Sequence, residues 1–293
     1  RLAVETDCAE VKPEYISAFK DYGIKPSMLR FGIGENVKAA FGPYDERGYN
    51  SAGKKYIFGV AEFIKANLKV SNDMKFVFVF TSDTCKPEDA ADLVRFLTLN
   101  PNDENAVGSN GVNYAAERVK LGLDKPVDIE CFEIGNELDM QYYGRDDDGF
   151  SEGADEYINW ADSMITAIKS VNPGAKTSVH SYTVPHDSNT GYRYKIWNEK
   201  VIGALGEKAD YVVLHYYYHY GTGFSSEMNE NRINTELLTY INRIDEDKRP
   251  KIYVSEHAIW GPINDEAKNS QDIYKVTSLQ GTLTTAEVIN RLV

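Results

Sequence analysis

Six short apolar segments, separated by amphipathic helical patterns, constrain the fold of this chain more than any other feature. The segments begin at Met28, Phe76, Val127, Lys176, Ala209 and Lys251. They start about 25 to 50 residues apart, which is the length of a βα unit. The run at 76–80 is continuously apolar, as in strands of a parallel sheet that are buried on both faces. No GxGxxG follows the first segment, which disfavours a dinucleotide-binding sheet. The spacing therefore predicts an α/β fold, and an eight-stranded (β/α)8 TIM barrel in particular.

Helical patterns fill the intervals between the apolar segments. They cover residues 13–22, 56–67, 87–97, 112–121, 155–171, 194–205 and 231–244, and a last one covers 271–292. If residues 2–5 form a first strand, the chain supplies seven strands and the eighth would follow Val293. We therefore expect a barrel that is truncated before its eighth strand. Because no Pro- or Ser-rich linker interrupts the pattern, residues 1–293 are predicted to form a single domain.

Composition narrows the range of partners. The net charge of −13, from 32 basic and 45 acidic side chains, argues against nucleic acid or an anionic membrane as a partner. No apolar run approaches the ~20 residues that a membrane-spanning helix needs. The three cysteines, Cys8, Cys85 and Cys131, lie far apart and form no CxxC pair, so we expect buried free thiols. Secreted and cytoplasmic locations both stay open.

The stretch 129–139 reads Ile-Glu-Cys-Phe-Glu-Ile-Gly-Asn-Glu-Leu-Asp and predicts a buried strand that ends in a polar turn. A Pro-containing break precedes it, which favours a strand over a helix. Gly135 lets the backbone leave the strand without a side chain in the way. Asn136 and Glu137 then lie at the carboxyl end of the strand, which is the rim on which βα barrels build active sites.

Polar residues lie at the ends of other predicted strands as well. They are Arg30, Asn36, His180, His215, Tyr217 and Glu256. Two rim residues, Glu137 and Glu256, are carboxylates on strands that are not neighbours in sequence. Glycoside hydrolysis needs such a pair, because one carboxyl group protonates the leaving oxygen while the other attacks or activates water. Asn136 is suited to bind a sugar hydroxyl. We expect Glu130 and Glu133, by contrast, to face solvent or to be paired.

Three motifs together resemble a group of enzymes. Phe-Glu-Ile-Gly-Asn-Glu-Leu-Asp at 132–139, Asp-Tyr-Val-Val-Leu-His-Tyr-Tyr at 210–217 and Ile-Tyr-Val-Ser-Glu at 252–256 have the order and spacing seen in the large Asn-Glu clan of retaining barrel glycosidases. Within that clan the chain is most similar to family 51, the α-L-arabinofuranosidases. The Leu-Arg-Phe-Gly-x-Gly segment at 29–34 and the Trp-Asn pair at 197–198 support the narrower match. The similarity extends from about Pro13 to the end of the chain.

The resemblance implies roles for individual residues. Glu137 matches the general acid/base and Glu256 the nucleophile of a double displacement, which implies carboxyl groups about 5–5.5 Å apart. Asn136, His215 and Tyr217 match positions that contact the sugar or the nucleophile. The remaining candidate substrate contacts are Asn36, Arg30, His180 and Trp260. The resemblance further implies a carbohydrate substrate, such as a plant-type polysaccharide side chain or an oligosaccharide, and neither a cofactor nor a metal.

The chain departs from the family pattern at two motifs. The loop after the second strand reads Gly-Ile-Gly-Glu-Asn where the family usually has Pro-Gly-Gly-Asn, and His257 stands where an aromatic residue usually follows the nucleophile. The family's eighth strand and its C-terminal β-sandwich have no counterpart in these residues. The departures concern the substrate more than the reaction type. Xylosidase, endoglucanase, agarase and uronidase activities therefore stay open beside arabinofuranosidase.

Two functions from other classes compete with this interpretation. A metal-dependent hydrolase would need several His or Asp ligands at strand ends, commonly His-x-His. The five histidines, at 180, 186, 215, 219 and 257, contain no such pair. A carbohydrate-binding barrel without activity is the second alternative, although both candidate glutamates are present. Activity that survives a chelator would dismiss the metal enzyme, and turnover of a nitrophenyl arabinofuranoside would dismiss the inactive barrel.

Overall fold

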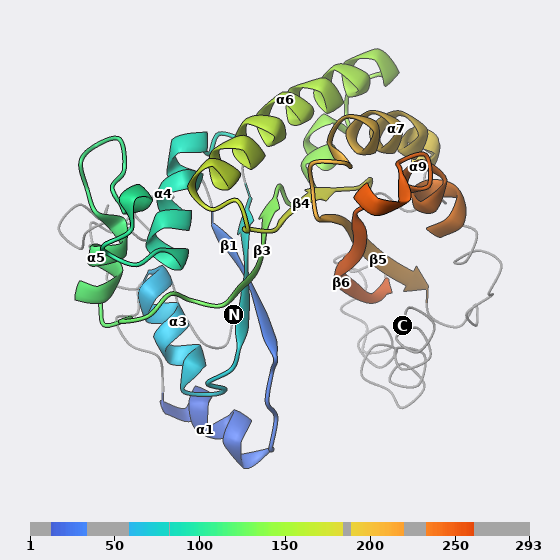
Figure 1. Ribbon diagram of the computed structural model, residues 1–293. Coiled ribbons are helices and arrows are strands. Elements are labelled where there is room, and N and C mark those ends of the chain that lie inside the picture. Colours follow the sequence, from blue (N-terminus) through green and yellow to red (C-terminus); the bar gives the residue numbers. More distant parts are fainter. Residues whose placement is uncertain (1–12, 34–58, 82, 184–188, 220–232, 261–293) are drawn as a thin grey trace. The chain divides into compact units, whose positions relative to one another are not determined.

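The computed structural model of the chain describes residues 13–33, 59–81, 83–183, 189–219 and 233–260 (Figure 1). The predicted strand at 2–5 and the predicted helix at 271–292 lie outside these residues. The chain divides into two compact units. The first unit comprises Arg1–Leu138 and Asn159–Ser178, and the second comprises Asp139–Ile158 and Val179–Val293. The single-domain interpretation of residues 1–293 stays a prediction.

The first unit is built on parallel strands. These are β1 (Met28–Ile33), β2 (Lys75–Phe80), β3 (Ile129–Ile134) and the first half of β4 (Thr177–His180), in that order in the sheet. β1 pairs with β2 and β2 with β3, both in parallel. Every residue of β2 after Lys75 is buried, which confirms the prediction made from its continuous apolar run.

The helices of the first unit follow the predicted pattern. They are α1 (Pro13–Asp21), α3 (Val60–Leu68), α4 (Pro87–Thr98), the 3-10 helix η2 (Glu104–Ala106), α5 (Tyr114–Lys120) and the second half of α6 (Asp147–Val171). α4 begins at a proline followed by two acidic residues, which suit the free N–H groups and the positive end of a helix. In Figure 1, α3, α4 and α5 lie on the same side of β1 and β3.

Phenylalanine rings join α3 to the sheet of the first unit. Phe63 of α3 stacks on Phe31 of β1 with ring centroids 4.3 Å apart, and it meets Phe76 of β2 edge-on at 6.1 Å. Phe76 is fully buried. Such aromatic contacts remove large apolar surfaces from water, so they hold α3 against β1 and β2.

The second unit contains the rest of β4 with β5 (Tyr211–His219) and β6 (Lys251–Trp260), in the order β4-β5-β6. β5 and β6 pair in parallel. The helical elements are η3 (Leu138–Tyr142), the first half of α6, η4 (Gly191–Arg193), α7 (Tyr194–Leu205), the π-helix η5 (Ile233–Leu238), α9 (Thr239–Ile241) and η6 (Glu246–Lys248). The first residue of η3, Leu138, belongs to the first unit. Both β4 and α6 contain residues of each unit.

Several predicted boundaries were wrong. α6 begins at Asp147 rather than at 155, because two acidic residues in its first turn favour the helix start. β5 and β6 continue to His219 and Trp260 rather than ending at 214 and 254. The described part of the predicted helix at 231–244 is a π-helix followed by a short α-helix. Backbone pairing between β5 and β6 extends the strands, and a pattern within one strand does not encode that pairing.

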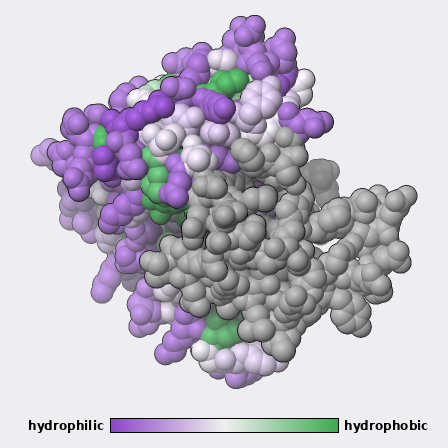
Figure 2. Space-filling view, turned by 90° about the vertical axis from the view of Figure 1, so that its right-hand side faces the viewer, coloured by the Kyte–Doolittle hydropathy of each residue, from purple (hydrophilic) through white to green (hydrophobic). Residues whose placement is uncertain are grey.

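The described surface is mainly hydrophilic on the face shown in Figure 2, where apolar residues form small separate patches. The large apolar side chains that are exposed among the described residues are Tyr22, Ile24, Met28, Val107, Met140 and Tyr192. Among the helices of the described residues, none combines the length and the apolar character that crossing a membrane requires.

Candidate active site

The motif that follows β3 has an uncommon backbone conformation. Gly135 leaves the strand with φ 95°, in the region that glycine enters without strain. Glu137 has φ 54° and is the one residue other than glycine with a positive φ in the described part of the chain. This left-handed conformation costs a residue with a Cβ roughly 1–2 kcal/mol. Strain of this kind gathers at functional sites, so it supports a functional role for Glu137.

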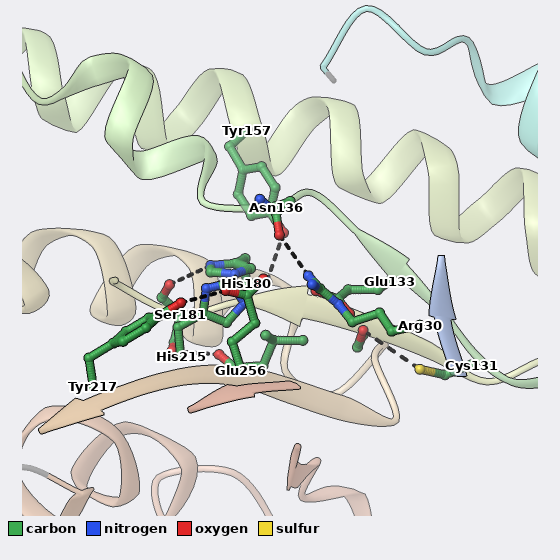
Figure 3. Close-up of polar contacts among 12 residues, drawn as sticks. Arg30, Cys131, Glu133, Asn136, Tyr157, His180, Ser181, His215, Tyr217 and Glu256 are labelled. Carbon is green, nitrogen blue, oxygen red and sulfur yellow. Dashed lines mark hydrogen bonds and ion pairs between the residues drawn. The ribbon is translucent and has the colours of Figure 1, made fainter. Parts of the chain in front are cut away.

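Arg30, Glu133 and Asn136 of the first unit form what we call the Arg30 cluster (Figure 3). It contains an ion pair whose carboxylate is buried and whose guanidinium is partly exposed. The Arg30 guanidinium donates from Nε to Glu133 Oε2 over 2.8 Å and from one terminal nitrogen to Oε1 over 2.6 Å. The Glu133 side chain is fully buried. Glu133 was expected to face solvent or to be paired, and it is paired with Arg30. Glu130 is paired as well, with Lys75 and Lys176.

Arg30 also orients the amide of Asn136. The same terminal nitrogen of Arg30 donates to Asn136 Oδ1 over 2.6 Å. Because a guanidinium has only donors, the amide oxygen must face Arg30, and the Nδ2 donors therefore point the other way. A fixed amide donor at the end of β3 is what binding of a hydroxyl oxygen requires.

A bulge sets the register of β5 and β6 in the second unit. Leu214 pairs with Val254, but the next residue, His215, pairs with Glu256, so Ser255 is an extra residue on β6. Bulges of this kind re-aim side chains next to active sites. The bulge places His215 opposite Glu256, and Tyr217 follows two residues later on β5.

Glu256 is held by neighbours on β5. The Tyr217 hydroxyl donates a hydrogen bond to Glu256 Oε2 over 2.7 Å, and His215 Nε2 lies 3.6 Å from Glu256 Oε1. The Glu256 side chain keeps 29% of its surface exposed, whereas that of His215 has none. The carboxylate is therefore oriented by the strand beside it and still accessible.

His180, at the end of β4, completes what we call the Glu256 cluster: His180, His215, Tyr217 and Glu256 (Figure 3). His180 Nδ1 lies 2.7 Å from the carbonyl oxygen of Ser181, and Nε2 lies 3.3 Å from His215 Nε2. The two imidazole rings meet edge-on, with centroids 4.5 Å apart. His180 is fully buried, so its contacts are with the protein interior.

An aromatic layer supports the backbone of His180 in the second unit. The Trp197 indole donates to the His180 carbonyl over 3.0 Å, and the His180 N–H donates to the Tyr157 hydroxyl over 2.9 Å. Tyr157 and Trp197 stack with centroids 5.2 Å apart, and Phe150 lies 5.8 Å from Trp197. The end of β4 is thus fixed by side chains from α6 and α7.

Asp139 has a structural role that could not be predicted from the sequence. Its fully buried carboxylate accepts from the Thr183 backbone N–H over 3.0 Å and from the Thr183 hydroxyl over 2.9 Å. It therefore ties the start of η3 to the segment after β4. The motif at 132–139 already contained this residue, but its partner lies 44 residues away, and no local pattern identifies it.

Burial and hydrogen bonding shift several pKa values near the motifs. Burial raises the pKa of the Cys131 thiol to about 12, and the Glu133 charge adds to the shift. Cys131 therefore stays a neutral thiol, and Cys85 and Cys131 are both buried thiols outside any disulfide, as predicted for the described cysteines. Burial also raises the pKa of Tyr182. The hydrogen bond from Tyr192 lowers the pKa of Asp147 at the start of α6.

The contacts described above join the predicted site residues within each unit. Arg30 and Asn136 are joined in the Arg30 cluster, with Glu137 next in the chain, and His180, His215, Tyr217 and Glu256 are joined in the other. The last three lie within strands rather than after them, which corrects the predicted strand ends. Asn36 lies outside the described residues, and Trp260 is described only as the last residue of β6. The roles assigned to all these residues stay predictions.

Comparisons with known proteins support the predicted fold. No family model and no curated protein matches the chain. Among solved structures, a family 51 α-L-arabinofuranosidase from Bifidobacterium longum has a TM-score of 0.63 and 18% identity over 95% of this chain and 55% of its own. An α-L-arabinofuranosidase from Thermotoga maritima has a TM-score of 0.60 and 20% identity over 90% of this chain and 53% of its own.

A third arabinofuranosidase, from Xanthomonas axonopodis, has a TM-score of 0.57 and 18% identity over 87% of this chain and 52% of its own. The chain thus spans about half the length of the solved structures that it resembles. The complete eight-stranded barrel stays a prediction. The chain shares its α/β fold with family 51 glycosidases, and the resemblance that its motifs suggested is confirmed at the level of the fold.

Proposed function

We propose that the chain is the catalytic part of a retaining glycoside hydrolase, of the α-L-arabinofuranosidase type. The observation that carries the proposal is the setting of Glu256. This carboxylate is accessible, receives a hydrogen bond from Tyr217 and lies beside His215 on a bulged strand pair. A nucleophilic carboxylate needs orientation and an open face, and this setting supports both.

Glu137 is the proposed general acid/base. Its strained backbone, its position after β3 and the neighbouring Asn136 support this role. In the proposed double displacement, Glu256 attacks the anomeric carbon and the C–O bond to the leaving group breaks. Glu137 gives its proton to the leaving oxygen, and as a carboxylate it then takes a proton from the water that cleaves the glycosyl ester. Asn136 would donate from Nδ2 to a sugar hydroxyl.

The sugar is proposed from the fold comparison and the motifs together. Arabinofuranosidases appear repeatedly among the solved structures of similar fold, and the motifs at 29–34 and 197–198 resemble the same family. The substrate would then be an oligo- or polysaccharide with arabinofuranosyl groups. We propose neither a metal nor a cofactor, because both catalytic roles are filled by carboxylates.

A panel of nitrophenyl glycosides tests the proposal. We expect turnover of the arabinofuranoside, loss of several orders of magnitude in Glu256→Ala, and partial rescue by azide, which attacks from the vacated side. Glu137→Ala should slow substrates with poor leaving groups far more than activated aryl glycosides. The first product should keep its anomeric configuration when it is followed by NMR.

Glu130→Ala is the matched control for these variants. Glu130 is also a β3 carboxylate, but it pairs with Lys75 and Lys176 away from the motif, so this variant should keep the parent rate. A Glu256→Ala chain with near-parent turnover, or an inverted first product, would contradict the mechanism. If the chain turns over a different glycoside and not the arabinofuranoside, the proposed sugar specificity is wrong and the proposed mechanism still holds.

A further inference from the structure

His180 makes two directional contacts that together define where its protons are. Nδ1 lies 2.7 Å from the Ser181 carbonyl oxygen, and Nε2 lies 3.3 Å from Nε2 of His215. A carbonyl oxygen has no proton to give, so His180 Nδ1 must be the donor in the first contact. One of the two Nε2 atoms must be the donor in the second.

Burial decides which of the two Nε2 atoms carries the proton. The His180 side chain is fully buried, and a charged imidazolium in that position would lose its hydration. The neutral ring with a proton on Nδ1 has a lone pair on Nε2. His215 Nε2 must then be the donor to that lone pair, and this holds whether the His215 ring is neutral or charged.

We propose that His180 is a positioning residue that keeps a proton on His215 Nε2, and thereby gives Glu256 an N–H neighbour instead of a lone pair. Oε1 of Glu256 lies 3.6 Å from the same His215 nitrogen. With the other tautomer, the lone pair of His215 would face a carboxylate oxygen, which is repulsive. This role rests on the proposed function of Glu256 as nucleophile, although the protonation pattern itself does not.

The surroundings of His180 are those of a fixed support. Its backbone N–H and carbonyl are both bonded, to Tyr157 and Trp197, and the ring is held at both nitrogens. The contact to Ser181 selects the tautomer of His180, and His180 in turn selects that of His215. A chain of this kind transmits hydrogen-bond direction without any group moving.

Nitrogen-15 NMR of the full chain at neutral pH tests the protonation pattern directly. With five histidines in the sequence, the ring signals can be assigned from single His variants. We expect His180 to carry its proton on Nδ1, and His215 to carry one on Nε2. In His180→Asn, which cannot reach His215, the Nε2–H form of His215 should lose its dominance. A His180 ring with a lone pair on Nδ1 would overturn the proposal, whatever the activity.

A pair of variants tests the consequence for turnover. In His180→Gln the longer amide places an acceptor near the former Nε2 position, whereas in His180→Asn the amide lies near the former Nδ1 position. Loss of a hydrogen bond next to a charged group predicts that His180→Asn lowers kcat about 10- to 100-fold, mainly in kcat rather than KM. His180→Gln should recover most of that loss.

Thermal unfolding of both variants separates positioning from stability. Equal losses of kcat in the Asn and Gln variants, at equal melting temperature, would overturn the proposal. If the parent chain turns over no glycoside, the proposed function fails, and the NMR pattern still decides whether His180 sets the His215 tautomer.

Discussion

At the scale of single residues, the clearest feature is that the Glu133 carboxylate is buried and not exposed to solvent. Glu133 and Glu137 lie four positions apart in the same motif, yet Glu133 is fully buried and Glu137 is half-buried. The difference follows from Arg30, which binds Glu133 through two nitrogens. A bidentate guanidinium makes burial of a carboxylate tolerable, and the same arginine orients Asn136.

Replacing Arg30 with alanine should lower the free energy of unfolding by about 3–5 kcal/mol, because the buried Glu133 carboxylate loses the cation paired with it. Adding Glu133→Gln should restore part of the loss, since no charge then stays buried. Urea unfolding measures both. Lys75→Ala removes an exposed partner of Glu130 and should leave stability nearly unchanged. An Arg30→Ala chain as stable as the parent would show that the pair contributes little.

At the scale of elements, the long helix α6 packs closely against η3, the 3-10 helix that follows Glu137. Gly153 of α6 faces the ring of Tyr142 in η3, and a Cβ at this position would clash with that ring. Tyr142 is buried and lies against Trp197, with ring centroids 6.3 Å apart. Glycine normally weakens a helix, but here it lets η3 pack directly on α6.

Gly153→Ala should therefore destabilise the chain by about 1–3 kcal/mol through overpacking, despite the better helix propensity of alanine. Gly203→Ala in α7 is the matched control. Apart from its chain neighbours and the α7 backbone, no atom of the described residues lies within 4 Å of a Cβ there, so this change should stabilise by about 0.4–1 kcal/mol. Chemical unfolding of both variants measures the difference. The same sign for both would mean that Tyr142 can move aside.

At the scale of the whole molecule, two elements link the compact units. α6 and β4 each contribute residues to both units, so neither unit has a complete set of elements without the other. A strand and a helix that continue from one unit to the next couple the unfolding of both. The single-domain organisation of residues 1–293 stays a prediction that unfolding can test.

We expect one cooperative unfolding transition for the full chain. Far-UV circular dichroism reports on both units, and tryptophan fluorescence reports on Trp160 in the first unit and on Trp197 and Trp260 in the second. The midpoints from both probes should coincide, because separate unfolding would break α6 and β4 internally. Two transitions, or midpoints that differ between the probes, would contradict the single-domain prediction.

The order of the elements and the identity of the motifs could be predicted from the sequence. The six described strands were predicted because apolar runs record burial along the chain, and Gly135 was predicted to be the residue at which the backbone leaves its strand. The sequence also identified Glu137 and Glu256 as candidates, since each follows or ends an apolar run in its own motif.

The contacts that support those residues could be seen only once the chain was folded. The bulge at Ser255 sets the pairing of His215 with Glu256, and Arg30 meets Glu133 across 103 residues of sequence. The contact between His180 and His215 likewise spans 35 residues. Each depends on register or packing between segments that are distant in the chain. A local pattern records periodicity and burial, whereas these contacts are fixed only when separate strands and helices pack together.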